Sequence, residues 1–426
     1  MTPAGSLLIR GGRLVDPLLG LDALADVRIA GGVVTEIGEH VTPHAGEAVL
    51  DASNAVVAPG FIDMHVHLRE PGFPEKETIA TGTQAAVRGG FTAVACMPNT
   101  RPALDDPDVL RALADAIKER ARCRVYPVAA ITRDRAGVEP CDFRALAQAG
   151  AVAFSDDGAT VANARVLREA ALRALDVTGA FISHCEDEAL KAGGLMNEGA
   201  AARALGVLAS PALAEDAIVG RDLLVAMDTG KAWHVAHLTT ARGLDLLRTA
   251  RARGCAATCE VTPHHLTFTD AAVAEFGGGA KVNPPLRTDA DVRALRDGVL
   301  DGTIDALATD HAPHTAAEKA AGLIDAAVGF SGLEIAVGAY AAALPDLPLR
   351  RFVELLSSNP ARILNVPGGT LALGAPGDVT VFADRPWRVD PGAFASKGRS
   401  TPFAGRTLPR QALATVVGGV VAFDAT

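Results

Sequence analysis

Aromatic residues and long apolar runs are both scarce in this sequence. Phe, Trp and Tyr make up 4% of the 426 residues, which argues against the stacking platforms on which proteins bind single-stranded nucleic acids. Lys and Arg are scattered and the formal net charge is -10, so the charge pattern gives no sign of a nucleic-acid partner. No apolar run reaches the roughly 18 residues of a membrane-spanning helix, and the first residues lack the basic and apolar regions of a signal peptide. We therefore expect a cytoplasmic protein that binds neither nucleic acid nor membrane.

The cysteines show none of the paired spacings of a zinc ribbon. Even the closest pair, Cys255 and Cys259, is interpreted as packing. In a large chain without a secretion signal, such residues are expected to be reduced thiols in the core. The six are Cys96, Cys123, Cys141, Cys185, Cys255 and Cys259.

Hydrophobic residues are abundant, at 49% of the chain, which is ample for one large domain and a smaller one. Between residues 58 and 365, short β-rich runs alternate with longer helical stretches rich in Ala, Leu and Arg. Eight such alternations predict a closed (β/α)8 barrel of the TIM type over residues 58–365. The eight runs are FIDMHVH from Phe61, FTAVACM from Phe91, RVYPVAA from Arg124, AVAFSDD from Ala151, AFISHC from Ala180, AWHVAHL from Ala232, AATCEV from Ala256 and IDALATD from Ile304.

The two ends of the chain have a different pattern, with short strands separated by Gly-rich turns. LLIRGGRLVD and DVRIAGGVVTEIG lie near the N-terminus, and GDVTVFA and ALATVVGGVVAF lie after Gly368. These segments predict one small β-sandwich built from residues 1–57 together with residues 366–426.

Histidine and aspartate residues recur where the predicted barrel strands end. His65, His67 and Arg69 alternate along the first strand, so their side chains share one face. Two histidines on a strand can also be a half-buried surface pair, but five of the eight strands end in His or Asp. Active-site groups lie at this end of such barrels, and three or four N and O ligands per ion suit a catalytic zinc. The other strand-end groups are Asp156, Asp157, His184, His237 and Asp310.

Eight motifs, in order along almost the whole chain, resemble the dihydroorotase family of the amidohydrolase superfamily. They are DMHVHLREPG (63–72), MPNT (97–100), SDDG (155–158), HCED (184–187), VAHLTT (235–240), EVTPHHL (260–266), VNPPLR (282–287) and ATDHAPH (308–314).

This resemblance implies a zinc centre of one or two ions, with two expected. His65, His67 and Asp310 would hold the more buried ion, and His184 and His237 the other. Many relatives bridge the ions with a carboxylated lysine on the fourth strand, where this chain has no lysine. It resembles instead the branch with a bridging aspartate, in which a 27-residue step to His184 selects Asp157. Asp156 would then support the site from outside.

The implied reaction interconverts N-carbamoyl-L-aspartate and L-dihydroorotate in de novo pyrimidine biosynthesis. Metal binding lowers the pKa of water to about 7, which supplies a nucleophile, and Asp310 would act as the catalytic proton shuttle. The ring carboxylate would be met by Arg69 and Asn99, and by a third group, His314. A surface ion pair with Glu70 or Glu75 is the alternative for Arg69.

Further substrate contacts are carried over from the resemblance. His67 borders the substrate, Asn283 would hold the ring, and the Val328-Gly329 pair stands where relatives commonly have Phe-Gly or Ala-Gly. The segment 313–332, with small residues and mixed charge, is expected to form a partly mobile loop over the site.

The other histidines near the strand ends have structural interpretations. His234, three residues before His237, is expected to face away from the site and pack against a helix. His264 and His265 follow the seventh strand and are expected to be structural or to support the site from outside.

Two alternative functions stay open. One is a hydantoinase or allantoinase type of cyclic amidase, and the other is a non-catalytic dihydroorotase-like subunit of an aspartate transcarbamoylase complex. An active enzyme could also form a homodimer or bind the transcarbamoylase.

Overall fold

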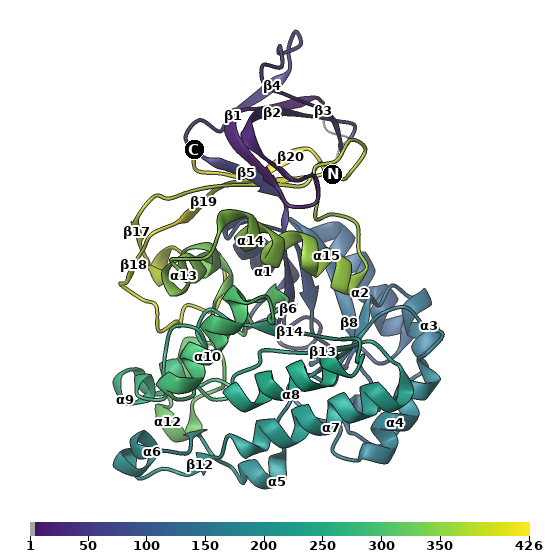
Figure 1. Ribbon diagram of the computed structural model, residues 1–426, viewed down its shortest axis with the longest axis vertical. Coiled ribbons are helices and arrows are strands. Elements are labelled where there is room, and N and C mark those ends of the chain that lie inside the picture. The colour runs from purple at the N-terminus through teal and green to yellow at the C-terminus, as the bar shows by residue number, and fades with distance from the viewer. Residues whose placement is uncertain (1–4) are drawn as a thin grey trace.

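A parallel eight-stranded barrel forms the centre of the computed structural model, which describes residues 5–426 (Figure 1). The strands pair in sequence order, and a bridge between Val66 and His311 links the first to the region after the last. Each strand lies inside one of the eight predicted runs, which confirms the (β/α)8 prediction. The strands are β6 (Phe61–Val66), β7 (Phe91–Cys96), β8 (Arg124–Ala129), β9 (Ala153–Phe154), β10 (Phe181–Ser183), β13 (Trp233–Val235), β14 (Ala257–Val261) and β15 (Ala306–Leu307).

Helices surround the barrel and begin at residues whose side chains cap their free N–H groups. Thr78 and Thr288 form capping boxes, and Asp106 caps a helix that starts with Pro107, as the chemistry of helix starts requires. The principal helices are α1 (Ile79–Arg88), α2 (Pro107–Arg120), α3 (Phe143–Gln148), α4 (Ala164–Arg173), α7 (Leu213–Thr229), α8 (Ala241–Ala252), α10 (Asp289–Leu300), α13 (Ala336–Ala343), α14 (Leu349–Val353) and α15 (Asn359–Leu364). No helix of residues 5–426 is long and apolar enough to cross a membrane.

Small side chains fill the inside of the barrel. Its core includes Ala93, Ala95, Ala153, Ala236 and Ala306, packed with a few larger residues such as Met64. A second apolar layer lies between the strands and the helices. The rigid, filled barrel therefore positions the residues that follow the strands, at the end where β6 runs into His67.

Smaller elements lie around that end of the barrel, at the bottom of Figure 1. They are α5 (Glu188–Lys191), β11 (Met196–Asn197), α6 (Ala200–Leu205), β12 (Ala209–Ser210), α9 (Ala272–Phe276), α11 (Ala316–Ala320) and α12 (Gly322–Asp325).

Strands from both ends of the chain form a second sheet, at the top of Figure 1. Strand β5 joins the two halves, because it pairs with β1 on one side and with β16 on the other. All eight strands belong to one hydrogen-bonded sheet folded around its own apolar core, so the predicted sandwich consists of a single folded sheet. The strands are β1 (Leu7–Asp16), β2 (Leu21–Ala30), β3 (Val33–Gly38), β4 (Ala48–Asp51), β5 (Val56–Pro59), β16 (Val379–Ala383), β19 (Gln411–Val417) and β20 (Val420–Asp424).

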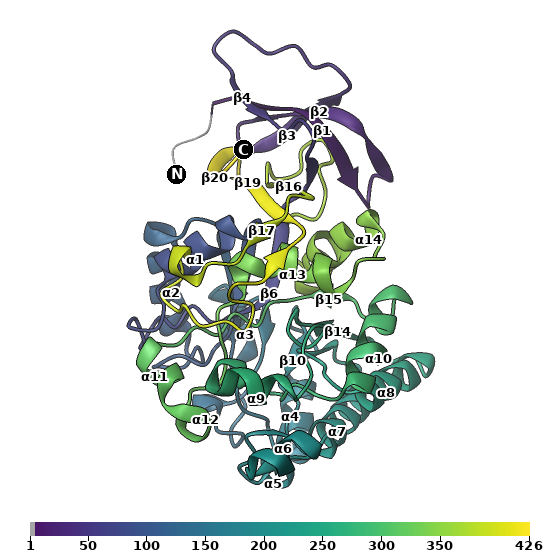
Figure 2. The same ribbon diagram turned by 90° about the vertical axis from the view of Figure 1, so that its left-hand side faces the viewer.

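Residues between β16 and β19 leave this sheet and pack on the barrel (Figure 2). They include the short hairpin of β17 (Trp387–Arg388) and β18 (Thr407–Leu408). Phe394 and Phe403 are buried in a cluster with Phe268 and Phe330 of the barrel. The predicted domain limits, at 57/58 and 365/366, stay a prediction. Strand β5 crosses the first of these limits.

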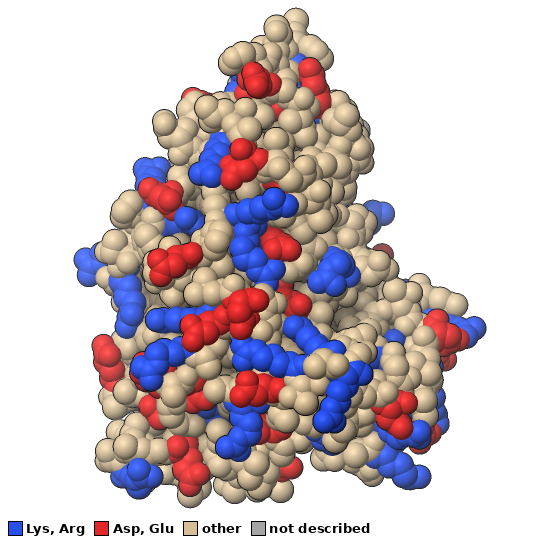
Figure 3. Space-filling model, in the orientation of Figure 1, with Lys and Arg blue, Asp and Glu red and all other residues tan. Residues whose placement is uncertain are grey.

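Charged side chains of both signs are interleaved on the face shown in Figure 3. That face carries no extended basic patch, in keeping with the scattered Lys and Arg of the sequence.

Candidate metal centre and substrate cavity

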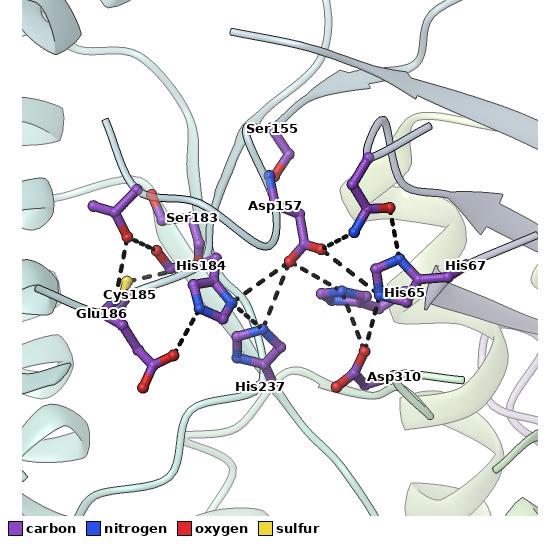
Figure 4. Close-up of polar contacts among 12 residues, drawn as sticks. His65, His67, Ser155, Asp157, Ser183, His184, Cys185, Glu186, His237 and Asp310 are labelled. Atoms are coloured by element: carbon purple, nitrogen blue, oxygen red, sulfur yellow. Dashed lines mark hydrogen bonds and ion pairs between the residues drawn. The ribbon is translucent and has the colours of Figure 1, made fainter. Parts of the chain in front are cut away.

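His65 and His67 direct their imidazole rings into one buried polar cluster at the end of β6 (Figure 4). His65 Nε2 lies 3.3 Å from Asp157 Oδ1, and His67 Nε2 lies 3.6 Å from Asp157 Oδ2. The alternation of side chains along a strand thus brings both histidines to the same carboxylate, as the spacing predicts.

Asp157 stands at the centre of this cluster. Its Oδ1 atom also lies 3.7 Å from His184 Nδ1 and 3.7 Å from His237 Nε2. Burial raises the pKa of Asp157, but the positive charge of His65 and of the other nearby histidines outweighs burial and holds that pKa well below its usual value. One carboxylate therefore contacts four histidines that come from three different strand ends.

Asp310 approaches the first two histidines from the end of β15. Its Oδ1 atom lies 3.1 Å from His67 Nε2 and 3.7 Å from His65 Nε2. Both Asp310 and His237 have positive φ angles, 47° and 31°. Such backbone is uncommon for residues other than glycine and often marks functional sites, where the surrounding structure holds it in place.

Asp156 points away from the cluster, although it is the neighbour of Asp157. It accepts hydrogen bonds from the backbone N–H groups of Ile131 (2.9 Å) and Thr132 (3.0 Å), and from the Thr132 hydroxyl. Asp156 therefore fixes the loop after β8, which agrees with the supporting role expected for it.

Three further side chains orient the histidines and were not identified as such from the sequence. Glu260 Oε1 lies 2.8 Å from His65 Nδ1, and Glu186 Oε2 lies 3.0 Å from His184 Nε2. Asn99 Oδ1 lies 2.8 Å from His67 Nδ1. In each case the acceptor keeps the hydrogen on the ring nitrogen that faces away from Asp157, the outer nitrogen. The inner nitrogen, which faces Asp157, then has a lone pair that can bind a metal ion.

His234 does not pack against a helix, so that expectation is wrong. It lies beside Thr258 in the paired strands β13 and β14, with its Nδ1 atom 2.7 Å from the Thr258 hydroxyl. Its Nε2 atom lies 3.2 Å from Glu260 Oε2, so His234 faces into the barrel and supports the carboxylate that orients His65. The error arose because residues three apart on a strand face opposite sides only while the strand stays regular, and β13 ends at Val235.

His264 and His265 are buried outside the cluster. His265 lies 2.8 Å from the Thr262 hydroxyl and 2.9 Å from the carbonyl oxygen of Pro284. Burial lowers the pKa of His264 to about 3, and its ring packs on Phe330.

The cluster fits a metal ion. His65 Nε2 and Asp157 Oδ1 are buried without a hydrogen-bond partner among residues 5–426, and a cation between them would satisfy both. Two sets of ligand atoms are close enough to share an ion: His65, Asp157 and His237, and His65, His67 and Asp310. The second set matches the more buried ion of the expected centre, and His184 Nδ1 lies 3.0 Å from His237 Nε2 beside the first.

A cavity of about 330 Å³ opens over this cluster. Arg69 Nε donates to the Pro313 carbonyl oxygen at 3.2 Å, and Arg69 Nη2 lies 3.1 Å from His314 Nε2. Glu70 pairs with Arg120 at 3.0 Å, and no ion pair joins Arg69 to Glu70 or Glu75 within the described chain. The cavity is lined by all the residues expected to bind substrate, namely His67, Arg69, Asn99, Asn283, His314, Val328 and Gly329, and by Asp157, His184, His237 and Asp310.

The segment 313–332 covers one side of the cavity and contains α11 and α12. Lys319 Nζ donates to the carbonyl oxygens of Ala327 and Gly329, each at 2.7 Å, and Lys76 pairs with Glu318 at 2.7 Å. These contacts fix the backbone around Val328 and Gly329 in the described conformation. The mobility expected for this segment stays a prediction.

The fold and site define a barrel amidohydrolase. The L-hydantoinase (dihydropyrimidinase) of Arthrobacter aurescens has a similar structure, with a TM-score of 0.88 at 24% identity over 99% of this chain and 97% of that one. A dihydropyrimidinase from Brevibacillus agri superposes with a TM-score of 0.85 at 19% identity, over 99% of this chain and 95% of that one. At these identities the likeness shows the fold alone.

Sequence relatives narrow the class further. The chain is 50% identical to a dihydroorotase of Pelotomaculum thermopropionicum over 97% of this chain and 98% of that protein. It is 44% identical to a dihydroorotase of Syntrophus aciditrophicus over 98% of this chain and 99% of that protein. The family described as "Dihydro-orotase-like" matches residues 54–242. The chain belongs to the dihydroorotase family.

Proposed function

We propose that this protein is a zinc-dependent dihydroorotase that interconverts N-carbamoyl-L-aspartate and L-dihydroorotate in pyrimidine biosynthesis. The observation that carries the proposal is the position of Asp157 among four histidines, in a cavity that also holds Arg69. The first feature supplies a metal centre, and the second supplies a cation for a substrate that bears a carboxylate.

The proposed ligands are His65, His67, Asp157, His184, His237 and Asp310, with two zinc ions expected. Zinc, when bound, polarises a carbonyl oxygen and lowers the pKa of water to about 7. The outer acceptors Glu260, Glu186 and Asn99 keep the inner imidazole nitrogens available as ligands.

Asp310 is the proposed proton shuttle. Burial raises its pKa, but the close approach of His67 and the charges of the histidines outweigh burial, so the carboxyl is held below its ordinary pKa and is an ionised acceptor. In hydrolysis it accepts a proton from the attacking water and delivers it to the amide nitrogen as the ring bond breaks. In cyclisation the same group moves protons in the opposite direction.

The substrate carboxylate is assigned to Arg69, Asn99 and His314. Arg69 offers a planar fork that matches a carboxylate. Burial and the charge of Arg69 lower the pKa of His314 to about 3, so His314 is a neutral hydrogen-bonding group at pH 7. Asn283, Val328 and Gly329 also line the cavity and are proposed to contact the ring.

The overall stoichiometry sets the direction of the pH effect on equilibrium. Cyclisation of carbamoyl aspartate turns one carboxylate into a neutral amide and consumes a proton. Acid therefore favours ring formation and alkali favours hydrolysis. The ring-forming direction is the one that pyrimidine synthesis requires.

A hydantoinase or allantoinase type of cyclic amidase is the second candidate, because its fold is shared. Asp157 in place of a lysine, and Arg69 beside the metal cluster, favour dihydroorotate. The test is to assay dihydroorotate and a 5-substituted hydantoin side by side with the same enzyme. Faster turnover of the hydantoin would contradict the proposal.

A non-catalytic subunit is disfavoured because all six proposed ligands meet in the structure. Asp310→Asn keeps the size of the side chain but removes a basic carboxylate oxygen, so we expect it to reduce hydrolysis at least ~100-fold. Near-normal hydrolysis by this variant would refute the shuttle role.

The proposal includes a cytoplasmic location, supported by six buried free cysteines in the described chain. A homodimer and a complex with aspartate transcarbamoylase stay predictions. Size-exclusion chromatography with light scattering, with and without the transcarbamoylase, tests both.

A further inference from the structure

A buried lysine lies directly behind the metal cluster. Lys191 is the last residue of α5, and its Nζ atom lies 3.0 Å from Glu186 Oε2. That oxygen is the one that orients His184, at 3.0 Å from His184 Nε2. Lys191 is 8% exposed and Glu186 is fully buried, so the pair is shielded from water and from salt.

The local structure explains how a lysine reaches this place. Asp187 caps α5 by accepting from the N–H groups of Ala189 and Leu190, and Ala192 ends the helix in a left-handed conformation with φ of 50°. This single turn carries Lys191 back over Glu186, the residue just before the cap.

Glu186 needs this counter-charge. A carboxylate removed from water is strongly unfavourable unless it is paired and hydrogen-bonded. Its Oε1 atom has no hydrogen-bond partner within residues 5–426, so His184 and Lys191, both on Oε2, are the side-chain partners of this carboxylate in the described chain. Glu188 is the only other acidic side chain within ion-pair distance of Lys191 in the described chain, at 3.5 Å, and it is 66% exposed.

Lys191 also reaches the substrate side of the site. Both polar atoms of the Asn283 amide have hydrogen-bond partners in one orientation of the amide. In that orientation its oxygen accepts from Lys191 Nζ at 2.7 Å and its nitrogen donates to the Val282 carbonyl oxygen at 3.0 Å. Asn283 lines the cavity above the metal cluster. The Lys191 ammonium group thus contacts Glu186, which orients the proposed ligand His184, and also contacts the amide of Asn283, which is proposed to bind the ring.

We propose that Lys191 is a positioning residue that holds Glu186 on His184 and Asn283 on the cavity wall, so that metal retention and substrate affinity depend on the same side chain. This inference rests on the proposed metal site and substrate cavity. It adds a residue that touches neither metal nor substrate.

Zinc affinity without substrate is the first test, measured by competition with a chromophoric chelator. Lys191→Met is expected to weaken zinc binding by ~10-fold or more, the range for loss of an outer partner. Lys191→Met combined with Glu186→Gln is expected to return to within about threefold of the wild type, because glutamine still accepts from His184 and leaves no buried charge. Unchanged zinc affinity in the single variant, or no recovery in the double variant, would overturn the inference.

The matched control is Lys231→Met. Lys231 is also a buried lysine, and its Nζ atom donates to the carbonyl oxygens of Ala174 (2.7 Å) and Val177 (2.8 Å), away from the metal cluster. This variant is expected to lower the melting temperature while zinc affinity stays unchanged. An equal loss of zinc in both lysine variants would mean that Lys191 has only a general structural role.

Steady-state kinetics of zinc-saturated enzyme test the second contact. The double variant restores an acceptor for His184 without a buried charge, but it does not restore the contact to Asn283. Its KM for dihydroorotate is therefore expected to stay raised severalfold, while kcat changes less. If Lys191→Met does not fold, Glu186→Gln and the double variant are compared directly: equal zinc affinity and a higher KM in the double variant support the inference, and a further tenfold loss of zinc contradicts it. Absence of dihydroorotate turnover in the wild type would refute the proposed function, while the zinc measurements would still decide the role of Lys191.

Discussion

The Nδ1 atom of His65 lies 2.8 Å from the Oε1 atom of Glu260, a residue 195 positions later in the chain. Burial raises the pKa of Glu260, but hydrogen bonds with His234 and His65 outweigh burial and lower it to about 2. An ionised acceptor therefore holds the Nδ1 hydrogen of His65 and leaves its Nε2 lone pair available to the proposed metal ion beside Asp157.

Replacing Glu260 should weaken metal binding although Glu260 is not a ligand. Glu260→Leu is expected to lower zinc affinity ~10- to 100-fold, because His65 loses the acceptor that fixes its ring. Glu260→Gln keeps an acceptor oxygen and should lose less. Chelator competition compares the two variants, and equal zinc affinities in wild type and Glu260→Leu would contradict the orienting role.

Asp156 and Asp157 should respond differently to the same change. Asp157→Ala removes the carboxylate shared by four histidines, so zinc affinity should fall by more than the roughly 100-fold caused by loss of an outer partner. Asp156→Ala should retain zinc but lose ~1–3 kcal/mol of stability, because the N–H groups of Ile131 and Thr132 lose their acceptor. Zinc content and denaturant unfolding measured on both variants test this assignment, and the reverse result would place the bridge at Asp156.

Arg69→Lys should mainly affect the use of dihydroorotate. Lysine keeps the positive charge but not the two-pronged fork, so kcat/KM should fall ~10- to 100-fold, in line with the value of a hydrogen bond to a charged group. Zinc content should stay unchanged. Arg133→Lys, at an exposed site, is the control. Unaltered kcat/KM for Arg69→Lys would remove Arg69 from the substrate site.

The barrel and the cluster were predictable because their signals are local. Each strand is a short apolar run, and a His or Asp that follows it lies at the same end of the barrel as the residues that follow the other strands. Asp157 and Asp156 were separable in sequence only through the family spacing, whereas the structure separates them by their hydrogen-bond partners.

The supporting residues were not predictable in the same way. Glu260 lies on β14 and orients His65 of the distant strand β6. The sequence of a strand does not show which side chain of another strand a glutamate will contact. Glu186 did carry a signal, since it lies two residues after His184. The packing of Phe394 and Phe403 on the barrel gave none, because isolated aromatic residues in a Gly- and Ser-rich segment show no periodicity.

Glu334 should make stability fall as the pH rises from 4.5 to 7. Its carboxylate accepts from the backbone N–H groups of Ala395 (2.8 Å) and Ser396 (3.2 Å) and lies 3.3 Å from Arg88 Nε. Burial raises its pKa from 4.5 to about 7 and outweighs these contacts, which lower the pKa. Below pH 4.5 the group is protonated in both states. Between 4.5 and 7 the unfolded chain loses the proton first, so the folded state is disfavoured by up to about 3 kcal/mol.

Glu334→Gln should remove that part of the pH dependence. Unfolding in denaturant at several pH values between 4.5 and 7 measures it, and Glu275→Gln, at an exposed position, serves as the control. The same slope in wild type and Glu334→Gln would show that this carboxyl is not the source.

Metal content and dihydroorotate hydrolysis, measured on the same sample before and after chelation and again after zinc is restored, test whether catalysis depends on a metal centre. We expect activity to fall in proportion to the zinc removed from the centre around Asp157 and to return when zinc is added back. Full activity in protein shown to be free of metal would exclude zinc-dependent hydrolysis.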